Sequence, residues 1–466
     1  MKSTLFLLAI AAYLSSAAFP SMFMDWVVSL LSILIVVVII NSVKLFVQVL
    51  GTIFLVTGIT LLVVYNAPWT NFILGFGVML NILSLFALIT LLALPIEHGR
   101  YALRVQSMIR SRVNNSGKLY SLTSFMSYIL SSFMNLATLP MMYHLIRPSL
   151  DMYPIENKER FMSRAITHGH SLTAVWTPAA PIVGIIIEMT GVQWSSIIVI
   201  LIPFSLLALV LDWTMGMWRT NRRQHQIGHI AIDEMSAARE EASESAKENL
   251  KKMETNHPIQ IFIAILIFNA LIFILEKYTH ASFLLLVSLT VIPFAFLWSL
   301  LLGKGKAFIV SAKRTLPEHL LKMKDQFFVF LSAGFMISAI QSTEAGHIIN
   351  EGIVAVKNVV GMDIFLLFIP LIPLGLAFLG LHPAVGLALT AESLNPATLG
   401  ISVEVTAIAM LTGAVTAFMM GPYNATAGLM SNLIGESPYR VSNWNAPFTI
   451  AYLILVMLLL TILNIG

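Results

Sequence analysis

The sequence contains no cysteine and little charge. Without cysteine the chain forms no disulfide bond, no thiolate metal site and no cysteine nucleophile. Charged residues make up 11% of the 466 residues, whereas soluble globular proteins carry about a quarter. So few charges cannot solvate the surface of a soluble enzyme of this length. The 58% of hydrophobic residues also excludes a disordered scaffold.

Hydrophobic runs of about 20 residues recur from one end of the chain to the other, and such a run can cross a bilayer as a helix. The sequence therefore predicts an all-α polytopic membrane protein with about 11 spans. We expect these spans at 3–19, 23–41, 45–66, 71–95, 159–190, 193–214, 258–275, 279–302, 326–342, 402–434 and 446–466. The first span could also be read as a cleaved signal peptide, because Lys2 precedes a run that ends in small residues. We favour a retained helix.

Two further hydrophobic stretches, 119–146 and 362–399, are interrupted by polar residues or proline. Both are predicted to be re-entrant hairpins, which enter the membrane and leave on the same side. The positive-inside rule supports this topology with the N-terminus in the cytoplasm. Only Lys277 and Lys357 of the 27 basic residues then lie outside. A true crossing at either stretch would exchange the sides of all later loops and remove this bias.

The polar segment 218–256 divides the chain into two halves, 1–217 and 257–466. We expect it to be a cytoplasmic tether that contains a solvated helix, or alternatively a docking site for a partner. Each half then runs through entry helices, an amphipathic segment, a hairpin, a broken helix and a final helix. We expect the broken helices at about 159–190 and 402–434. Because the two hairpins open from opposite sides, the halves are predicted to be inverted repeats, which is typical of transporters.

The centres of the two broken helices combine proline or glycine with hydroxyl and amide side chains. Proline lacks an amide hydrogen and clashes with the preceding turn, so the first helix should open near residues 175–178. The freed carbonyls and the neighbouring hydroxyls are candidates to bind a small cation or a polar substrate. The first break supplies Ser171, Thr173, Thr177 and Pro178, and the second supplies Thr416, Gly421, Asn424 and Thr426.

The hairpin tips are expected to form the other side of this site. A tip directs a helix N-terminus and its unpaired amides towards the middle of the membrane, which favours an anion. The first tip supplies Ser132, Asn135, Ala137 and Thr138, and the second supplies His382 and Pro383. His382 is a candidate to donate to an anion or to titrate near neutral pH.

In these motifs the sequence resembles the ion-transporter superfamily, which includes the divalent anion–sodium symporters. That family carries a Ser-Asn-Thr-Ala-Thr hairpin, commonly followed by proline, before a broken helix that contains Thr-Pro. The residues that match are Asn135, Ala137, Thr138, Pro140, Thr177 and Pro178, and the segment from Gly421 to Ala425 is similar to the second break. Met134 and Leu136 replace the serine and first threonine of the hairpin. His382 and Pro383 stand where the second hairpin of the family has Ser-Asn-Thr.

The resemblance implies a homodimer in which the hairpins and broken helices form a transport domain. That domain would move against a scaffold in an elevator-like cycle. Backbone and hydroxyl groups around the tips and breaks would bind the coupled sodium. The implied location is the cytoplasmic membrane of a prokaryote, with the N-terminus and the 218–256 loop in the cytoplasm.

Ionisable residues inside the membrane are costly to bury and therefore mark candidate sites. Glu392 lies in the second hairpin and is a candidate for proton or cation coupling. His168 and His170 precede the first break, and their spacing directs them to different faces of a helix, which argues against a shared metal. The sequence contains neither a His-Glu-x-x-His motif nor a glycine-rich phosphate loop followed by Lys-Ser/Thr.

We therefore expect a secondary transporter, not an enzyme, that moves a small organic anion, a carboxylate in our leading interpretation. Na⁺ or H⁺ would be the coupling ion, and we expect no other cofactor and no nucleic-acid partner. One alternative is a cation/proton antiporter of the same superfamily that uses Glu392. Another is a non-transporting membrane enzyme or regulatory scaffold that has kept the transporter architecture.

Overall fold

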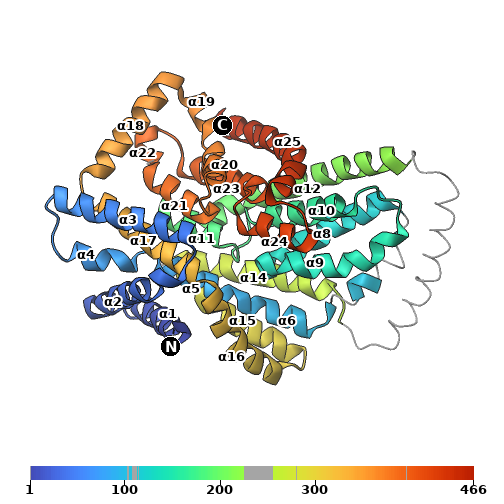
Figure 1. Cartoon of the computed structure of the whole chain (residues 1–466), viewed down its shortest axis with the longest axis horizontal. Helices are drawn as coiled ribbons and strands as arrows, with labels where there is room; N and C mark the ends of the chain where they lie inside the picture. Colours follow the sequence, from blue (N-terminus) through green and yellow to red (C-terminus); the bar gives the residue numbers. More distant parts are fainter. Residues whose placement is uncertain are drawn as a thin grey trace.

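The structure is a computed structural model of the chain, and it describes residues 2–101, 104–107, 113, 115–224, 256–279, 281–394 and 396–465. This part of the chain is helical and contains no strand (Figure 1). Nine of its helical segments are long and apolar enough to cross a membrane, or up to ten if one bent pair counts as a span, and one of the nine is the predicted hairpin segment Ser116–Met152. The predicted all-α polytopic membrane fold is confirmed.

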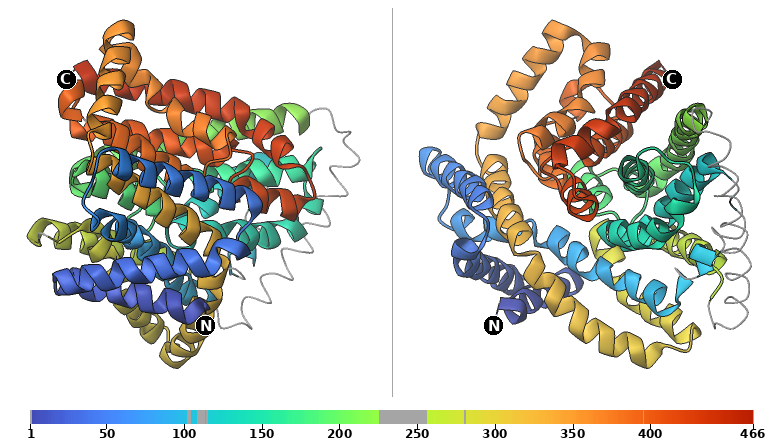
Figure 2. Two further views of the ribbon diagram at one scale, coloured as in Figure 1. Left: turned by 60° about the vertical axis from the view of Figure 1, so that its left-hand side comes forward. Right: turned by 45° about the vertical axis from the view of Figure 1, so that its right-hand side comes forward.

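We divide the helices into two groups, and the right-hand view of Figure 2 shows the blue N-terminal helices of the first apart from the red C-terminal helices of the second. The first group contains the entry helices of both halves. Its members are α1 (Lys2–Ala18), α2 (Met22–Ile39), α3 (Leu45–Val64), α4 to α6 (Asn71–Leu74, Leu80–Leu88 and Ala93–His98), α14 (Ile259–Tyr278), α15 (Phe283–Leu301), α16 (Gly305–Lys322) and α17 (Lys324–Gln341). Gly51 and Gly58 of α3 face the rings of Phe328 and Phe335 on α17, so the absence of a side chain lets these helices pack closely. The amphipathic helix α16 bends by 61° from α17.

The second group contains the predicted hairpins, broken helices and final helices. From the first half it takes α8 (Ser116–Met134), α9 (Thr138–Ile146), α10 (Lys158–Thr173), α11 (Pro181–Thr190) and α12 (Trp194–Gln224). From the second half it takes α19 (Met362–Phe368), α20 (Leu371–Phe378), α21 (Pro383–Ser393), α22 (Pro396–Leu399), α23 (Val403–Met420), α24 (Ala425–Ile434) and α25 (Pro438–Ile465). Helix α18 (Ala345–Val360) connects α17 to α19.

Both predicted hairpins fold back on themselves. In the first, α8 ends at Asn135, whose φ of +48° redirects the chain into α9. The Tyr153 hydroxyl beyond α9 donates to the Val113 carbonyl before α8 at 3.0 Å, so the two ends meet. In the second, Lys357 donates to the Leu399 carbonyl at 3.3 Å across the ends of the hairpin. Both segments therefore return to the side from which they start.

Both predicted helix breaks are present. Helix α10 ends at Thr173, and α11 begins at Pro181, where the missing amide hydrogen is harmless because first-turn amides have no helical partner. Helix α23 ends at Met420, and α24 begins after Asn424. The Asn424 side chain accepts from the Ala427 amide at 2.7 Å and so caps α24.

The two halves pack crosswise. The first arm of each hairpin packs on the broken helix of its own half, α8 on α10 and α20 on α23. The second arm packs on the broken helices of both halves, α9 on α24 and α10, and α21 on α11 and α23. Glycines allow the first arms to pack this closely on their broken helices. A Cβ atom on Gly169 of α10 would lie 2.1 Å from the Ser124 carbonyl oxygen, and one on Gly413 of α23 would lie 2.5 Å from Pro370.

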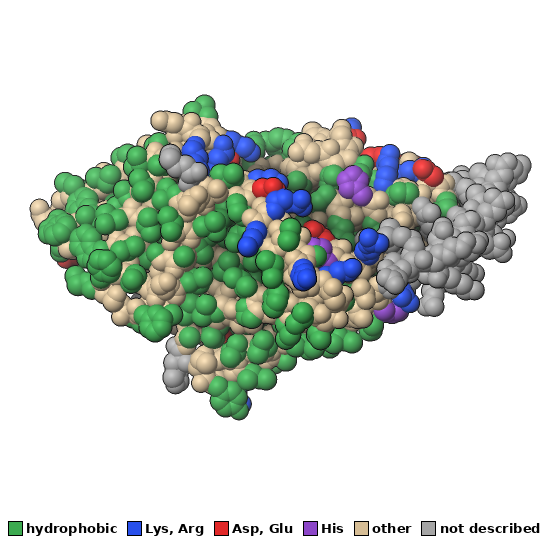
Figure 3. All heavy atoms as spheres, turned by 90° about the horizontal axis from the view of Figure 1, so that it is seen from below, with side chains coloured by type: hydrophobic (Ala, Val, Ile, Leu, Met, Phe, Trp, Pro, Cys, Tyr) green, Lys and Arg blue, Asp and Glu red, His purple; other side chains and the backbone are tan. Residues whose placement is uncertain are grey.

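Large hydrophobic side chains are exposed on the outer helices, as expected for a surface in contact with lipid. Figure 3 shows hydrophobic side chains over much of one face, with lysine and arginine gathered over a limited part of it. Of the predicted linker 218–256, the structure describes only the end of α12 and residue 256. The predicted linker helix lies outside the described residues. The division into inverted repeats stays a prediction.

Candidate functional site

A cavity of about 240 Å³ lies where the two hairpin tips and the two helix breaks meet. Residues of all four features line it. The first tip contributes Asn135 and Ala137, the first break Ala174, Ala180 and Pro181, the second tip His382, and the second break Phe418 and Ala425. The structure therefore brings together four segments that are distant in the sequence and that the sequence analysis assigned to one site.

Four helices begin at the wall of this cavity. They are α9, α11, α21 and α24, whose first residues or N-cap residues lie in its lining. A helix N-terminus carries a partial positive charge and amides without a helical partner. Four such ends therefore present backbone amides to the cavity, beside the C-terminal ends of α8, α10 and α23, and none of its lining residues is lysine or arginine.

The cavity extends from the tips along the first group of helices. Its lining follows the chain from Phe86 on α5 to Glu97 in the last turn of α6. It also includes His319 on α16 and Gln326 on α17. The end near Glu97 and α16 is the end that the predicted topology places at the cytoplasm. The cavity thus reaches from the hairpin tips towards this predicted cytoplasmic end.

His382 is held firmly at the second tip. Its Nδ1 accepts from the Ala384 amide at 3.2 Å and caps α21, and Pro383 occupies the first helical position. Its ring meets the rings of Phe86 and Phe330 edge to face at centroid distances of 6.5 Å and 6.1 Å. Because Nδ1 accepts from the backbone, Nε2 carries the hydrogen and is the atom that can donate to a ligand.

Asn135 and His170 contribute polar groups on the other side of the cavity. Asn135 combines φ of 48° with ψ of −130°, a backbone conformation that few residues other than glycine adopt. His170 is buried, and its Nδ1 lies 2.9 Å from the Ser131 hydroxyl. Both residues appear in the cavity lining.

Several predicted site residues lie beside the cavity and tie the first break to the first hairpin. The Thr177 hydroxyl donates to the Ser132 carbonyl at 3.0 Å and accepts from the Ala179 amide at 3.3 Å, across Pro178. The Thr173 hydroxyl donates to the Tyr128 carbonyl at 2.7 Å. The Ser132 hydroxyl donates within its own helix. These groups fix the geometry of the break and are not among the lining residues.

The second break is fixed in a similar way. The Asn424 amide donates to the Ala417 carbonyl at 2.6 Å and to the Phe418 carbonyl at 3.0 Å. Gly421 allows this turn, because a Cβ atom there would lie 2.7 Å from the Ala417 carbonyl oxygen. The Thr416 hydroxyl donates to the Gly413 carbonyl within α23.

Three predicted hydroxyls are buried and have no hydrogen-bond partner within the part of the chain that the structure describes. They are Thr138 on α9, Ser171 on α10 and Thr426 on α24. These three helices pack on one another. Hydroxyl oxygens without a protein partner are available as ligands for a small hard cation such as Na⁺. Glu392, by contrast, is partly exposed, accepts from Gln341 at 2.7 Å and is absent from the cavity lining.

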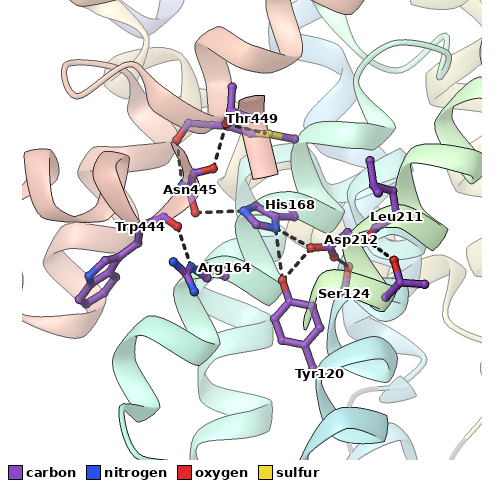
Figure 4. A network of polar contacts seen from close by, with 11 residues as sticks. Tyr120, Ser124, Arg164, His168, Leu211, Asp212, Trp444, Asn445 and Thr449 are labelled. Carbon is purple, nitrogen blue, oxygen red and sulfur yellow. Dashed lines mark hydrogen bonds and ion pairs between the residues drawn. The ribbon is translucent and has the colours of Figure 1, made fainter. Parts of the chain in front are cut away.

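The sequence analysis missed a buried polar network centred on Asp212 of α12 (Figure 4). The carboxylate is 1% exposed and accepts from the hydroxyls of Tyr120 at 2.7 Å and Ser124 at 2.6 Å. Its Oδ1 lies 2.6 Å from Nδ1 of His168. A lone aspartate in an otherwise apolar run is the signal that could have identified it, because a buried charge needs partners.

The network also reaches the second half of the chain. Nε2 of His168 lies 3.2 Å from Oδ1 of Asn445 on α25, and the Asn445 amide donates to the Met419 carbonyl at 2.8 Å. One turn before His168, Arg164 donates to the Trp444 carbonyl at 2.6 Å. Within the described residues, no group of three or more histidine and acidic side chains is arranged to hold a metal ion. His168 and His170 indeed have separate partners.

Taken together, these elements form a polytopic helical membrane protein with hairpins, broken helices and a central cavity between two helix groups. No family model matches the sequence, and no curated protein matches it. Among solved structures, the chain is similar to the YdaH transporter of Alcanivorax borkumensis, whose crystal structure is described as revealing an unusual topology. The TM-score is 0.54 at 14% identity, and the match covers 81% of this chain and 84% of that one. At this identity the likeness concerns the fold, and the resemblance to the ion-transporter superfamily stays a prediction.

Proposed function

We propose that this protein is a secondary transporter of a small organic anion, coupled to Na⁺ or H⁺. The observation that carries the proposal is the convergence of four helix N-termini and two helix breaks on one cavity. Substrate sites of secondary transporters lie at the middle of the membrane, where the half-helix N-termini of discontinuous helices point at anionic groups.

The cavity favours a small carboxylate as substrate. Its volume of about 240 Å³ is below the roughly 300–1,000 Å³ of sites for drug-sized ligands. At the hairpin tips, backbone amides at the helix ends, the Asn135 amide and Nε2 of His382 can donate to a carboxylate. Because no lysine or arginine lines the cavity, the transporter can release its substrate without breaking a fixed ion pair.

Three buried hydroxyls near the cavity support coupling to a cation. The unpartnered hydroxyls of Thr138, Ser171 and Thr426 lie on helices that pack together beside the first tip and the second break. A Na⁺ ion bound there would complete the hydrogen-bonding capacity of these groups and fix the hairpin in its substrate-binding geometry. In the proposed cycle the second helix group moves against the first, in a homodimer in the cytoplasmic membrane.

A thermal-stability screen of the purified protein tests this function. The protein would be heated with mono- and dicarboxylates, each in Na⁺ and in K⁺ at several pH values. A ligand that binds the folded state raises the melting temperature by mass action. At a concentration one hundred times its Kd it raises the free energy of unfolding by about 2.7 kcal/mol. We expect one class of carboxylate to stabilise the protein and its effect to depend on the cation or on pH.

Variants make this screen specific. His382→Ala removes a donor from the cavity and should abolish the carboxylate effect, whereas Glu392→Gln lies outside the cavity and should retain it. Stabilisation that depends on the cation and on Glu392 but on no carboxylate would instead indicate a cation/proton antiporter. A protein that responds to no solute and moves none in proteoliposomes would contradict the transporter proposal.

A further inference from the structure

The hydrogen bonds around His168 determine how many protons its ring carries. On one side, Nδ1 lies 2.6 Å from Oδ1 of Asp212, whose carboxylate already accepts from the hydroxyls of Tyr120 and Ser124. Two hydroxyl donors on one carboxylate favour its ionised form. Nδ1 of His168 must therefore donate, and this side of the ring carries a hydrogen.

On the other side, Nε2 also faces an oxygen. It lies 3.2 Å from Oδ1 of Asn445, and the orientation of this amide is set by its own bond to the Met419 carbonyl. The opposite amide orientation would place two oxygens face to face. Nε2 must then donate as well, so the site is complementary to an imidazolium with both nitrogens protonated.

The surroundings of the ring also suit a cation. The ring of Phe448 on α25 stacks on His168 at a centroid distance of 4.4 Å and an angle of 26°, and an aromatic face attracts positive charge. Both His168 and Asp212 are 1% exposed, so an ion pair between them leaves the interior without net charge.

We propose that His168, paired with Asp212, is the proton-binding site through which the transporter is coupled to a proton gradient. This inference rests on the proposed transport function. The geometry favours the protonated ring, because Nε2 without its hydrogen presents a lone pair to the Asn445 oxygen. Loss of the proton therefore breaks the link between His168 and Asn445, which joins the two halves of the second helix group.

The link joins the helices that lead to the two breaks. His168 lies two residues before His170, which lines the cavity. At its other end, Asn445 holds the carbonyl of Met419, and the adjacent Phe418 also lines the cavity. Protonation of His168 thus adds a bond between the helices that lead to the two breaks, and proton release removes it, while Arg164 still donates to the Trp444 carbonyl.

The proton can reach the site from a small pocket of about 70 Å³. Tyr120 lines this pocket, and its hydroxyl contacts Asp212 and lies 3.2 Å from Nδ1 of His168. The charged groups that face the network are Asp212 on α12 and Arg164 on α10, with Arg160, Arg219 and Glu156 in the pocket wall. Helix α25 contributes only uncharged groups, from Asn445, Phe448 and Thr449.

Nitrogen-15 NMR of histidine-labelled protein in lipid nanodiscs tests the protonation state without any assay of transport. The chain has 11 histidines, and the signal of His168 is identified by its loss in His168→Gln. We expect two protonated ring nitrogens at neutral pH and the loss of one proton as the pH rises. The exposed His347→Gln variant is the matched control. A His168 ring that stays singly protonated at neutral and mildly acidic pH would overturn the proposal.

Uptake of a radiolabelled carboxylate into proteoliposomes tests the coupling, with the compound that stabilises the protein most as the probe. For one coupled proton, each unit of pH gradient should raise the equilibrium accumulation about tenfold. His168→Gln should abolish this effect of the gradient while the carboxylate still stabilises the protein. Asn445→Asp places a second carboxylate at Nε2 and should move the pH midpoint of the uptake rate upwards.

The outcomes separate the two proposals. Uptake that responds to the pH gradient equally in the wild type and His168→Gln would refute the role of His168 and leave the transporter intact. No uptake and no stabilisation by any carboxylate, with the expected NMR signal present, would refute the transport function and leave the proton site. If His168→Gln does not fold, Tyr120→Phe and Asn445→Asp provide the same pH readout in variants that keep the ring.

Discussion

Replacing Gly169 with alanine should destabilise the protein strongly, because this position sets the distance between α8 and α10. A Cβ atom on Gly169 would lie 2.1 Å from the Ser124 carbonyl oxygen and 2.9 Å from the Ser127 Cβ. An ordinary contact needs about 3.4 Å, so the two helices would have to separate by about 1.3 Å. The oxygen belongs to the backbone and cannot move aside by a rotamer change.

The expected magnitude follows from two opposing effects. Overpacking of a close-packed interior costs typically about 1–3 kcal/mol and occasionally more. Alanine in place of glycine in a helix returns about 1 kcal/mol through its higher helix propensity. Because the whole of α8 must shift, we expect a net loss of about 2 kcal/mol. The shift also moves the Ser124 hydroxyl away from Asp212 and weakens the buried network.

The assay is thermal unfolding in detergent or nanodiscs, followed by the fluorescence of the eight tryptophans. Gly428→Ala in α24 is the matched control, because no atom lies within 4 Å of its Cβ position. This control should unfold at the wild-type temperature or slightly above it. A Gly169→Ala protein as stable as Gly428→Ala would refute the close approach of α8 and α10.

Three further predictions concern caps and the cavity. Glu276→Gln should lower the melting temperature in the same fluorescence assay. The Glu276 carboxylate accepts from the amides of Trp194 and Ser195 at 2.7 Å and 2.8 Å, and a charged cap of this kind contributes about 1–2 kcal/mol. Asn424→Ala should destabilise by at least about 1 kcal/mol in the same measurement, because it removes the cap of α24 and two bonds across the second break. His382→Asn should retain part of the carboxylate-dependent stabilisation that His382→Ala loses, because the asparagine amide can replace the histidine donor. Isothermal titration calorimetry with the same carboxylate measures the affinity of each variant.

The sequence predicted most of the fold because hydrophobic length and charge placement constrain a membrane chain strongly. Ten of the 11 expected spans coincide with a helix or a pair of helices in the structure, and the span at 71–95 coincides with the run of three helices α4 to α6. The hairpins were predictable because polar residues and proline interrupt an apolar run only where protein or water covers the backbone. The bend between α16 and α17 was not predicted, because an amphipathic helix at the surface has too little apolar length to count as a span.

The site was predictable at the level of segments rather than side chains. Asn135, Ala137 and His382 line the cavity, whereas Thr173 and Thr177 use their hydroxyls to hold the backbone of the first break. Local sequence cannot distinguish these roles, because the direction of each hydroxyl depends on the packing of a distant hairpin. Two partners of Asp212, Ser124 and His168, lie 88 and 44 positions earlier in the chain, and only the fold brings them together.

The crosswise packing of the hairpins has a consequence for biosynthesis. Helix α9 meets its partner α24 only after the ribosome has translated nearly the whole second half of the chain. At synthesis rates of about 5–20 residues per second, this delay is on the order of tens of seconds. During that time the first hairpin tip, with its irregular backbone, lacks one of the helices that later cover it. The newly inserted first half therefore depends on lipid, water or a membrane chaperone until the last helices arrive.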